Sequence, residues 1–181
     1  MHSYGKRAPG SDGSDHIHRE KIASQYKISA SYKQKLKALV VLNAISCSVI
    51  ICHLLQVKAN ISLTRQVLPA VELWEYIYLC TIGVSLLGWM SLPRNKSNIL
   101  TAYIFCNAMF SVAPLFVAAF LHVPELSDLL MHKRANMHLF GQPCALVLYS
   151  FLTLAGVVNT CAIFCASKLV QAWRMKGCKS R

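Results

Sequence analysis

Residues that could carry chemistry are sparse in this chain and stand apart from one another. His53 lies inside an apolar run, Glu75 lies at the edge of the next run, and His122 is isolated. Acid–base or nucleophilic catalysis needs such groups in pairs, for example a nucleophile beside its base. The spacing therefore predicts no catalytic site, and it disfavours an enzyme of lipid or glycan metabolism.

The sequence also predicts no metal site and no cofactor. His16, His18 and Glu20 alternate on a short polar segment, but no further ligand follows them. The eight cysteines form no CxxC pair and no cysteine–histidine spacing typical of zinc sites. Seven of them lie in or beside apolar runs, where cysteine is a small hydrophobic residue. The eighth, Cys178, is either palmitoylated at the membrane edge or a free thiol.

The composition explains why charged pairs are so scarce. The chain is 55% hydrophobic and 14% charged, with a mean hydropathy of +0.41, whereas an ordinary soluble domain is about 25% charged. Such a composition is expected where lipid surrounds most of the chain. The 19 Lys and Arg outnumber the 7 Asp and Glu, but they lie at the chain ends and between apolar runs. This pattern is typical of charges that set membrane topology, and it argues against nucleic-acid binding.

Four apolar runs are long enough to cross a bilayer as helices. They predict an all-α membrane protein with a four-helix transmembrane domain at residues 38–167. The first run is expected to act as a signal anchor, because residues 1–35 contain no apolar core. The expected spans are 38–57, 74–92, 99–121 and 144–167.

The segments outside the spans are basic. Residues 1–37 are predicted to be flexible at first and then to form a basic amphipathic helix beside the membrane. Its lysines either bind anionic headgroups or only fix the orientation of the first span. Residues 168–181 form a basic tail. Fifteen Lys and Arg fall on the side of both termini and four on the other side, so both termini are expected to be cytoplasmic.

Small and polar residues recur at helical spacing in the second and third spans. Such faces let helices approach closely in lipid, and their polar groups hydrogen-bond across helices. They serve either the bundle itself or a homo-oligomer. Pro114 is also expected to kink the third span. The candidate helix-packing residues are Thr81, Ser85, Gly88, Asn107, Ser111 and Pro114.

Two ionisable residues near the membrane need an explanation. Asn43, Ser46 and His53 share one face of the first span, and an intramembrane histidine is a functional candidate. His53 lies only about a turn from Lys58, which favours a structural histidine, either interfacial or hydrogen-bonded. Glu75 lies at the mouth of the second span, and we interpret it as an interfacial charge that water still reaches.

Short motifs run through most of the chain in a fixed order. They are GSDGSD at 10–15 with HRE at 18–20, WEY at 74–76 with YL at 78–79, SLLG at 85–88, PRN at 93–95 and FSVAPL at 110–115. Each motif alone is weak, but together they are specific. With them the chain resembles the Jagunal family of endoplasmic-reticulum membrane proteins.

The resemblance implies a multi-pass protein of the endoplasmic reticulum, tied to the organisation of that organelle, to vesicle-mediated transport and to secretion. It implies no catalytic residues, and it implies a link to the COPI coat in some animals. The candidate coat contact is the basic tail, with Lys176, Lys179 and Arg181. Lys179 is third from the end, but Cys178 and Gly177 occupy the places of the second lysine in a dilysine signal. A looser basic contact is therefore expected.

Two functions follow from these observations. The first is a non-enzymatic endoplasmic-reticulum membrane protein that supports organelle organisation and vesicle-mediated transport in the early secretory pathway. Its partners are the lipid bilayer and, through the tail, coat subunits. The alternative is a small oligomeric channel or transporter, since the small-residue faces allow dimerisation. Ion-coupled carriers usually hold charged groups deep in the membrane, and His53 is the only deep titratable candidate here.

Overall fold

The computed structural model describes residues 14–59, 70–93, 95–132, 138–139 and 142–177. Nearly all of these residues are helical. This confirms the predicted class, an all-α chain with four helices suited to a membrane. The four stretches that are long and apolar enough to cross a bilayer are Tyr26–Lys58, Leu73–Ser91, Ser97–Leu121 and Cys144–Arg174.

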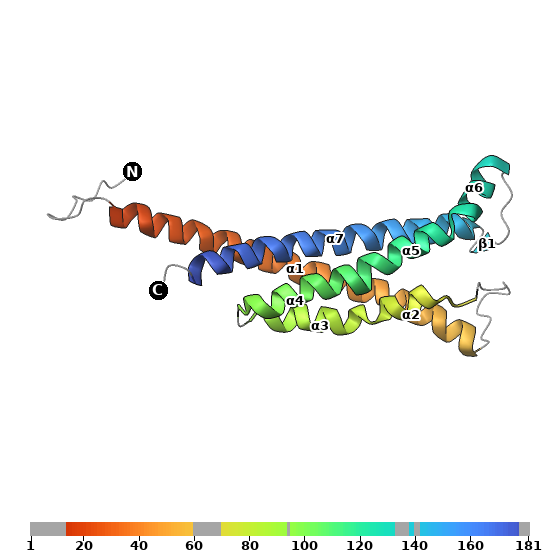
Figure 1. Ribbon diagram of the computed structural model, residues 1–181, viewed down its shortest axis with the longest axis horizontal. Helices are drawn as coiled ribbons and strands as arrows, with labels where there is room; N and C mark the ends of the chain where they lie inside the picture. The colour runs from red at the N-terminus through yellow and green to blue at the C-terminus, as the bar shows by residue number, and fades with distance from the viewer. Residues whose placement is uncertain (1–13, 60–69, 94, 133–137, 140–141, 178–181) are drawn as a thin grey trace.

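The first span belongs to a much longer helix. Helix α1 (Ser14–Ala59) is one unbroken element of 46 residues, with no proline or glycine in it. At about 1.5 Å per residue it is about 70 Å long, more than twice the hydrocarbon thickness of a bilayer. The lysine-rich segment before the span therefore continues the axis of the span. Figure 1 shows the start of α1 projecting beyond the end of α7 (Cys144–Gly177).

The second span is made of two helices in sequence, α2 (Leu73–Leu79) and α3 (Thr81–Ser91). Cys80 joins them, and its N–H bonds to the Ile77 carbonyl oxygen, three residues earlier, at 3.1 Å. The turn that follows α3 contains Asn95 with φ of 50°. Asparagine tolerates this left-handed conformation better than most residues, which allows the chain to reverse within a few residues.

The third span contains a π-helical turn just before its proline. Pro114 has no backbone N–H to donate and its ring crowds the preceding turn. The helix adapts by widening, and the Ala113 N–H bonds to the Ala108 carbonyl oxygen, five residues earlier. The disturbance expected at Pro114 thus takes the form of a π turn. The elements of this span are α4 (Ser97–Asn107), η1 (Ala108–Val112) and α5 (Ala113–Leu121).

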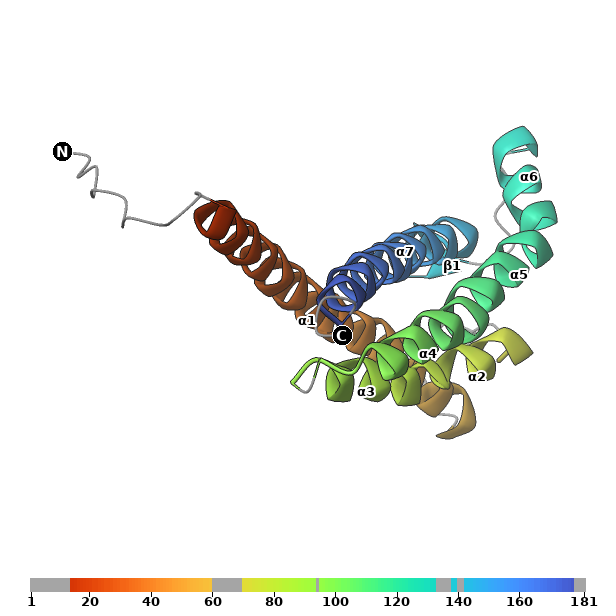
Figure 2. The same cartoon turned by 60° about the vertical axis from the view of Figure 1, so that its left-hand side comes forward.

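At the end of the bundle opposite the start of α1, helix α6 (Val123–His132) turns away from the other helices in both views (Figures 1 and 2). A short antiparallel pair follows, β1 (His138–Leu139) with β2 (Gln142–Pro143). Helix α7 then runs back along α1. The beginning of α1 and the end of α7 therefore lie at the same end of the molecule, which we call the terminal end.

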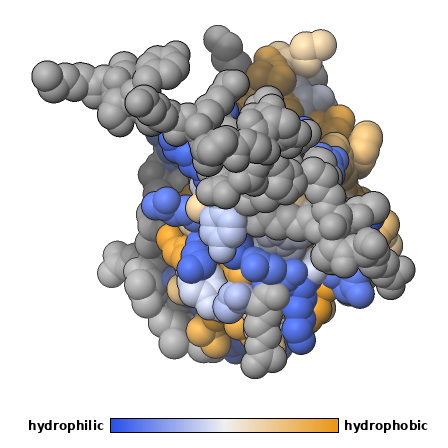
Figure 3. Space-filling view, turned by 90° about the vertical axis from the view of Figure 1, so that its left-hand side faces the viewer, coloured by the Kyte–Doolittle hydropathy of each residue, from blue (hydrophilic) through white to orange (hydrophobic). Residues whose placement is uncertain are grey.

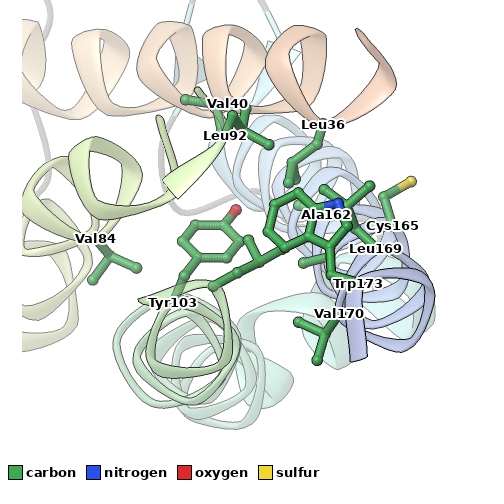
Figure 4. Packing of buried hydrophobic residues seen from close by; sticks show 12 residues of the cluster. Leu36, Val40, Val84, Leu92, Tyr103, Ala162, Cys165, Leu169, Val170 and Trp173 are labelled. Atoms are coloured by element: carbon green, nitrogen blue, oxygen red, sulfur yellow. The ribbon is translucent and has the colours of Figure 1, made fainter. Parts of the chain in front are cut away.

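The buried core consists of two apolar clusters. The cluster near the terminal end contains Leu36 and Val40 of α1, Tyr103 of α4, and Leu169 and Trp173 of α7 (Figure 4). The second cluster lies toward α6 and includes Cys47, Ile50, Trp74, Tyr78, Leu115 and Leu152. Large apolar side chains on the outer faces are exposed, as lipid-facing residues should be. Examples are Ile45, Leu55, Leu86, Phe105, Phe116 and Val157.

Helices α3 and α4 approach most closely at Gly88. A Cβ atom at this position would lie 2.8 Å from two ring carbons of Tyr103. Tyr103 is 3% exposed, so its ring cannot move aside without disturbing the surrounding core. Glycine at position 88 therefore sets the separation of these two helices.

A Gly88→Ala substitution tests this contact. It is expected to destabilise the detergent-solubilised protein by about 1–3 kcal/mol, because it overpacks the core. Gly83→Ala on the same helix is the matched control, since no atom lies within 4 Å of its Cβ position. The control should be neutral or slightly stabilising, because alanine is the better helix former. Equal melting temperatures for the two variants would contradict the close approach.

Candidate functional site

A cluster of buried polar side chains lies where the helices meet. It consists of Asn43 of α1, Tyr78 of α2, Ser85 of α3 and Asn159 of α7, and we call it the interhelical polar network. On α1 and on α7 its asparagine falls between the two apolar clusters. Inside a bilayer such groups have no water to bond with, so they must satisfy one another.

Asn43 is the centre of the network. Its Oδ1 accepts hydrogen bonds from the Tyr78 hydroxyl at 3.0 Å and from Asn159 Nδ2 at 3.2 Å. Its Nδ2 donates to Ser85 Oγ at 2.9 Å. Asn159 Nδ2 also donates to the Ala155 carbonyl oxygen of its own helix at 2.9 Å. One amide thus connects α1 to α2, α3 and α7.

Two further contacts extend this network. Asn107 Nδ2 donates to the Asn159 carbonyl oxygen at 3.4 Å, which adds the third span. Cys47 Sγ and Thr81 Oγ1 lie 3.1 Å apart and join α1 to α3 again. Every span therefore contributes at least one polar group to the interior, and the relative rotation of the helices is specified by these bonds.

The structure places all six candidate helix-packing residues in the interior. Thr81, Ser85 and Asn107 belong to the network or bond to its neighbours, and Gly88 faces Tyr103. The remaining two, Ser111 and Pro114, are buried in the third span. The candidate tail contact cannot be described in the same way. Lys176 is in the last turn of α7 and its side chain is not described, and Lys179 and Arg181 lie outside the described residues.

Two residues that the sequence presents separately form a pair. His53 Nδ1 and Glu75 Oε2 lie 3.0 Å apart, which agrees with the interpretation of His53 as a hydrogen-bonded histidine. The expectation that water still reaches Glu75 was wrong. It is 6% exposed rather than open to water, because α1 covers it where the second span begins. A buried carboxylate needs such a partner.

His122 is not isolated either. Its Nε2 lies 3.3 Å from Glu72 Oε1 and its Nδ1 lies 3.3 Å from Glu125 Oε2. Trp74 Nε1 donates to Glu72 Oε2 at 3.0 Å and helps to position that carboxylate. Each carboxylate faces a different ring nitrogen, so the donors do not converge on one point. In the described part of the chain, no group of three His, Cys, Asp or Glu side chains is arranged to hold a metal.

Sequence reasoning missed two members of the network, Tyr78 and Asn159. Asn159 had a usable signal, because it is the only Asn or Gln in residues 144–167 and an amide in a span normally faces other helices. Tyr78 had none. Tyr76 has the same side chain two positions away, yet it is 42% exposed whereas Tyr78 is fully buried.

The fold defines a helical bundle with four helices long and apolar enough to cross a membrane, joined by a polar network in the interior. A family model described as "Jagunal, ER re-organisation during oogenesis" matches residues 1–177. The chain therefore belongs to the Jagunal family, which confirms the resemblance seen in its motifs.

Individual relatives agree with this assignment. Protein jagunal homolog 1 of Bos taurus and that of Homo sapiens are each 32% identical over 169 residues, which cover 93% of this chain and 92% of the relative. Protein jagunal of Drosophila melanogaster is 22% identical over 185 residues, covering 95% of this chain and 94% of the relative. The similarity thus extends over almost the full length of each protein.

A double-mutant cycle on Asn43 and Tyr78 tests the network. Tyr78→Phe removes only the hydroxyl that donates to Asn43, and Asn43→Ala removes the acceptor. We expect a coupling of about 0.5–1.7 kcal/mol in the free energy of unfolding in detergent or bicelles, the range for hydrogen bonds between membrane helices. Tyr76→Phe combined with Asn43→Ala is the matched control and should show no coupling. Strictly additive effects of Tyr78→Phe and Asn43→Ala would rule out this hydrogen bond.

Proposed function

We propose that this chain is a non-enzymatic protein of the endoplasmic-reticulum membrane. Its role is to support organisation of that organelle and vesicle-mediated transport in the early secretory pathway. The observation that carries this function is membership of a family described by endoplasmic-reticulum re-organisation, matched over residues 1–177. Relatives that match over almost their whole length support the transfer of this role to the entire chain.

The architecture suits a protein that presents surfaces to partners. The polar side chains of the network bond to one another across the spans, which makes the bundle a stable membrane anchor. At the terminal end, the start of α1 extends beyond the end of α7, which lies beside it (Figure 1). The basic start of α1 and the end of α7, which precedes the basic tail in the sequence, therefore lie on one side of the membrane.

We place the terminal end in the cytoplasm. Residues 26–37, 95–101 and 164–174 contain seven Lys and Arg and no acid, whereas Glu72, Glu75, Glu125 and Asp128 lie toward the opposite end. An excess of Lys and Arg beside the spans is typical of cytoplasmic loops.

Protease protection on sealed endoplasmic-reticulum vesicles tests this orientation. Epitope tags placed before Met1 and after Arg181 are expected to be digested without detergent. A tag inserted in the segment between Leu121 and Cys144 should be digested only after detergent is added. Protection of either terminal tag in intact vesicles would contradict the proposed topology.

We also propose that the basic tail contacts coat subunits. Helix α7 ends at Gly177 at the terminal end of the bundle, and the basic tail with Lys176, Lys179 and Arg181 is the part of the sequence at and after this helix end. Crosslinking of the intact protein in endoplasmic-reticulum membranes is expected to capture coat subunits, and changing all three residues to alanine should abolish the capture. The matched control is the charge-preserving exchange Lys176→Arg, Lys179→Arg and Arg181→Lys.

This charge-preserving variant distinguishes a contact that depends on positive charge from one that depends on the identity of the tail residues. It should capture coat subunits about as well as the original chain, because a looser contact depends on charge rather than on a defined lysine pair. Failure to capture coat subunits with any variant would leave the tail as a topology determinant and would reject the coat contact. It would not affect the assignment to the family.

A further inference from the structure

We propose that the terminal end contains a binding site for the phosphate-bearing headgroup of an anionic phospholipid. A pocket of about 210 Å³ lies between α1, the α3–α4 turn and α7. It is independent of the tail, and the proposed contact with coat subunits plays no part in it. Its lining residues are Tyr26, Ser29, Ala30 and Lys33 of α1, Asn95 of the turn, and Trp173 of α7.

The pocket is built by contacts between segments that are far apart in the sequence. Trp173 Nε1 donates to Ser29 Oγ at 3.2 Å and attaches α7 to α1. Lys33 Nζ lies 5.6 Å from the centroid of the Trp173 ring, a cation–π contact that holds the ammonium group in place. Figure 4 shows the Trp173 indole extending from α7 among the apolar side chains of this end. The wall of the pocket is therefore supported by the core.

The groups that line the pocket suit a phosphate. Lys33 supplies an ammonium group, Asn95 an amide, and Tyr26 a phenol hydroxyl. The Ser29 hydroxyl accepts from Trp173 and keeps its own proton to donate. Among the described residues that line the pocket, none is an acid. Charge-assisted hydrogen bonds from such donors to phosphate oxygens are about twice as strong as neutral ones.

The position of the pocket favours a lipid as the source of this phosphate. Tryptophans mark the headgroup level of membrane proteins, and here Trp173 and Trp89 each pair with a lysine. Lys37 Nζ lies 5.7 Å from the Trp89 ring centroid. Figure 3 shows hydrophilic side chains gathered on this end of the molecule. A headgroup confined to this plane meets the pocket at a high local concentration, which a free anion does not.

The volume also fits a headgroup. Pockets for drug-sized ligands measure about 300–1,000 Å³, so about 210 Å³ accommodates a small phosphate-bearing group. The acyl chains would stay in the bilayer beside the exposed apolar residues of α1, such as Val41 and Leu42. The size thus favours a small headgroup over a large branched one.

Lipid retention by the full-length protein tests the site. The protein is reconstituted in phosphatidylcholine vesicles that contain phosphatidic acid as the probe, extracted in mild detergent, and analysed by native mass spectrometry. Lys33→Gln is expected to lower the retained phosphatidic acid about tenfold, because it removes the charge-assisted hydrogen bond that the Lys33 ammonium group donates to the phosphate in the pocket. The matched control is Lys35→Gln, which removes the same charge from α1 but lies outside the pocket lining. It should retain phosphatidic acid like the original chain.

A second variant, Asn95→Gly, tests the site independently in case Lys33→Gln impairs folding. Asn95→Gly keeps the left-handed backbone, which glycine adopts readily, and removes only the amide that lines the pocket. It should also lower retention while leaving the melting temperature unchanged. If Lys33→Gln unfolds the protein, Asn95→Gly decides the outcome alone, and normal retention by this variant would overturn the site.

Three further results would overturn the lipid site. Retention of phosphatidic acid no greater than that of phosphatidylcholine would show that the pocket binds no anionic headgroup. Equal losses from Lys33→Gln and Lys35→Gln would show a diffuse attraction of the basic surface. Displacement of the lipid by inorganic phosphate at physiological ionic strength would show that the pocket takes the free anion instead.

Discussion

The bundle depends on one buried amide, that of Asn43. Within a bilayer an unpaired amide costs several kcal/mol, because no water is present to bond with it. Asn43 avoids this cost only when Tyr78, Ser85 and Asn159 come to it from three other helices. Apolar side chains pack almost as well against lipid as against each other, so they define the arrangement of the helices weakly. The hydrogen bonds of this amide therefore specify the arrangement of the helices, which apolar packing alone defines only weakly.

The other features of the interior fit around this point. The two apolar clusters lie on either side of the network, so the network occupies the middle of the bundle. Gly88 brings α3 against Tyr103 of α4, and the π turn before Pro114 lets the third span stay continuous past its proline. The glycine permits the close contact between α3 and α4, and the π turn accommodates the proline. Both features preserve the packing of the four spans around the network.

The two ends of the bundle differ in their chemistry. At the end near α6, imidazoles pair with carboxylates, as in His53 with Glu75 and His122 with Glu72 and Glu125. At the terminal end, residues 26–37, 95–101 and 164–174 contain lysines and an arginine but no acid, and Lys33 lies over the Trp173 ring. This asymmetry suits a protein whose partners, whether lipid headgroups or proteins, meet it on one side of the membrane. It also fits the role in endoplasmic-reticulum organisation that we propose for this member of the Jagunal family.

The sequence by itself determined the class of the protein, its four apolar helices and its family, because hydrophobic length and charge placement are local properties of the chain. It also singled out Thr81, Ser85 and Asn107 by their spacing. Only the tertiary structure decided which polar groups meet. The pairing of His53 with Glu75 joins residues 22 positions apart, and the bond between Asn159 and Asn43 joins residues 116 positions apart. Helical periodicity identifies the face on which a side chain lies, but the rotation and depth of each helix against its neighbours determine which partner it finds.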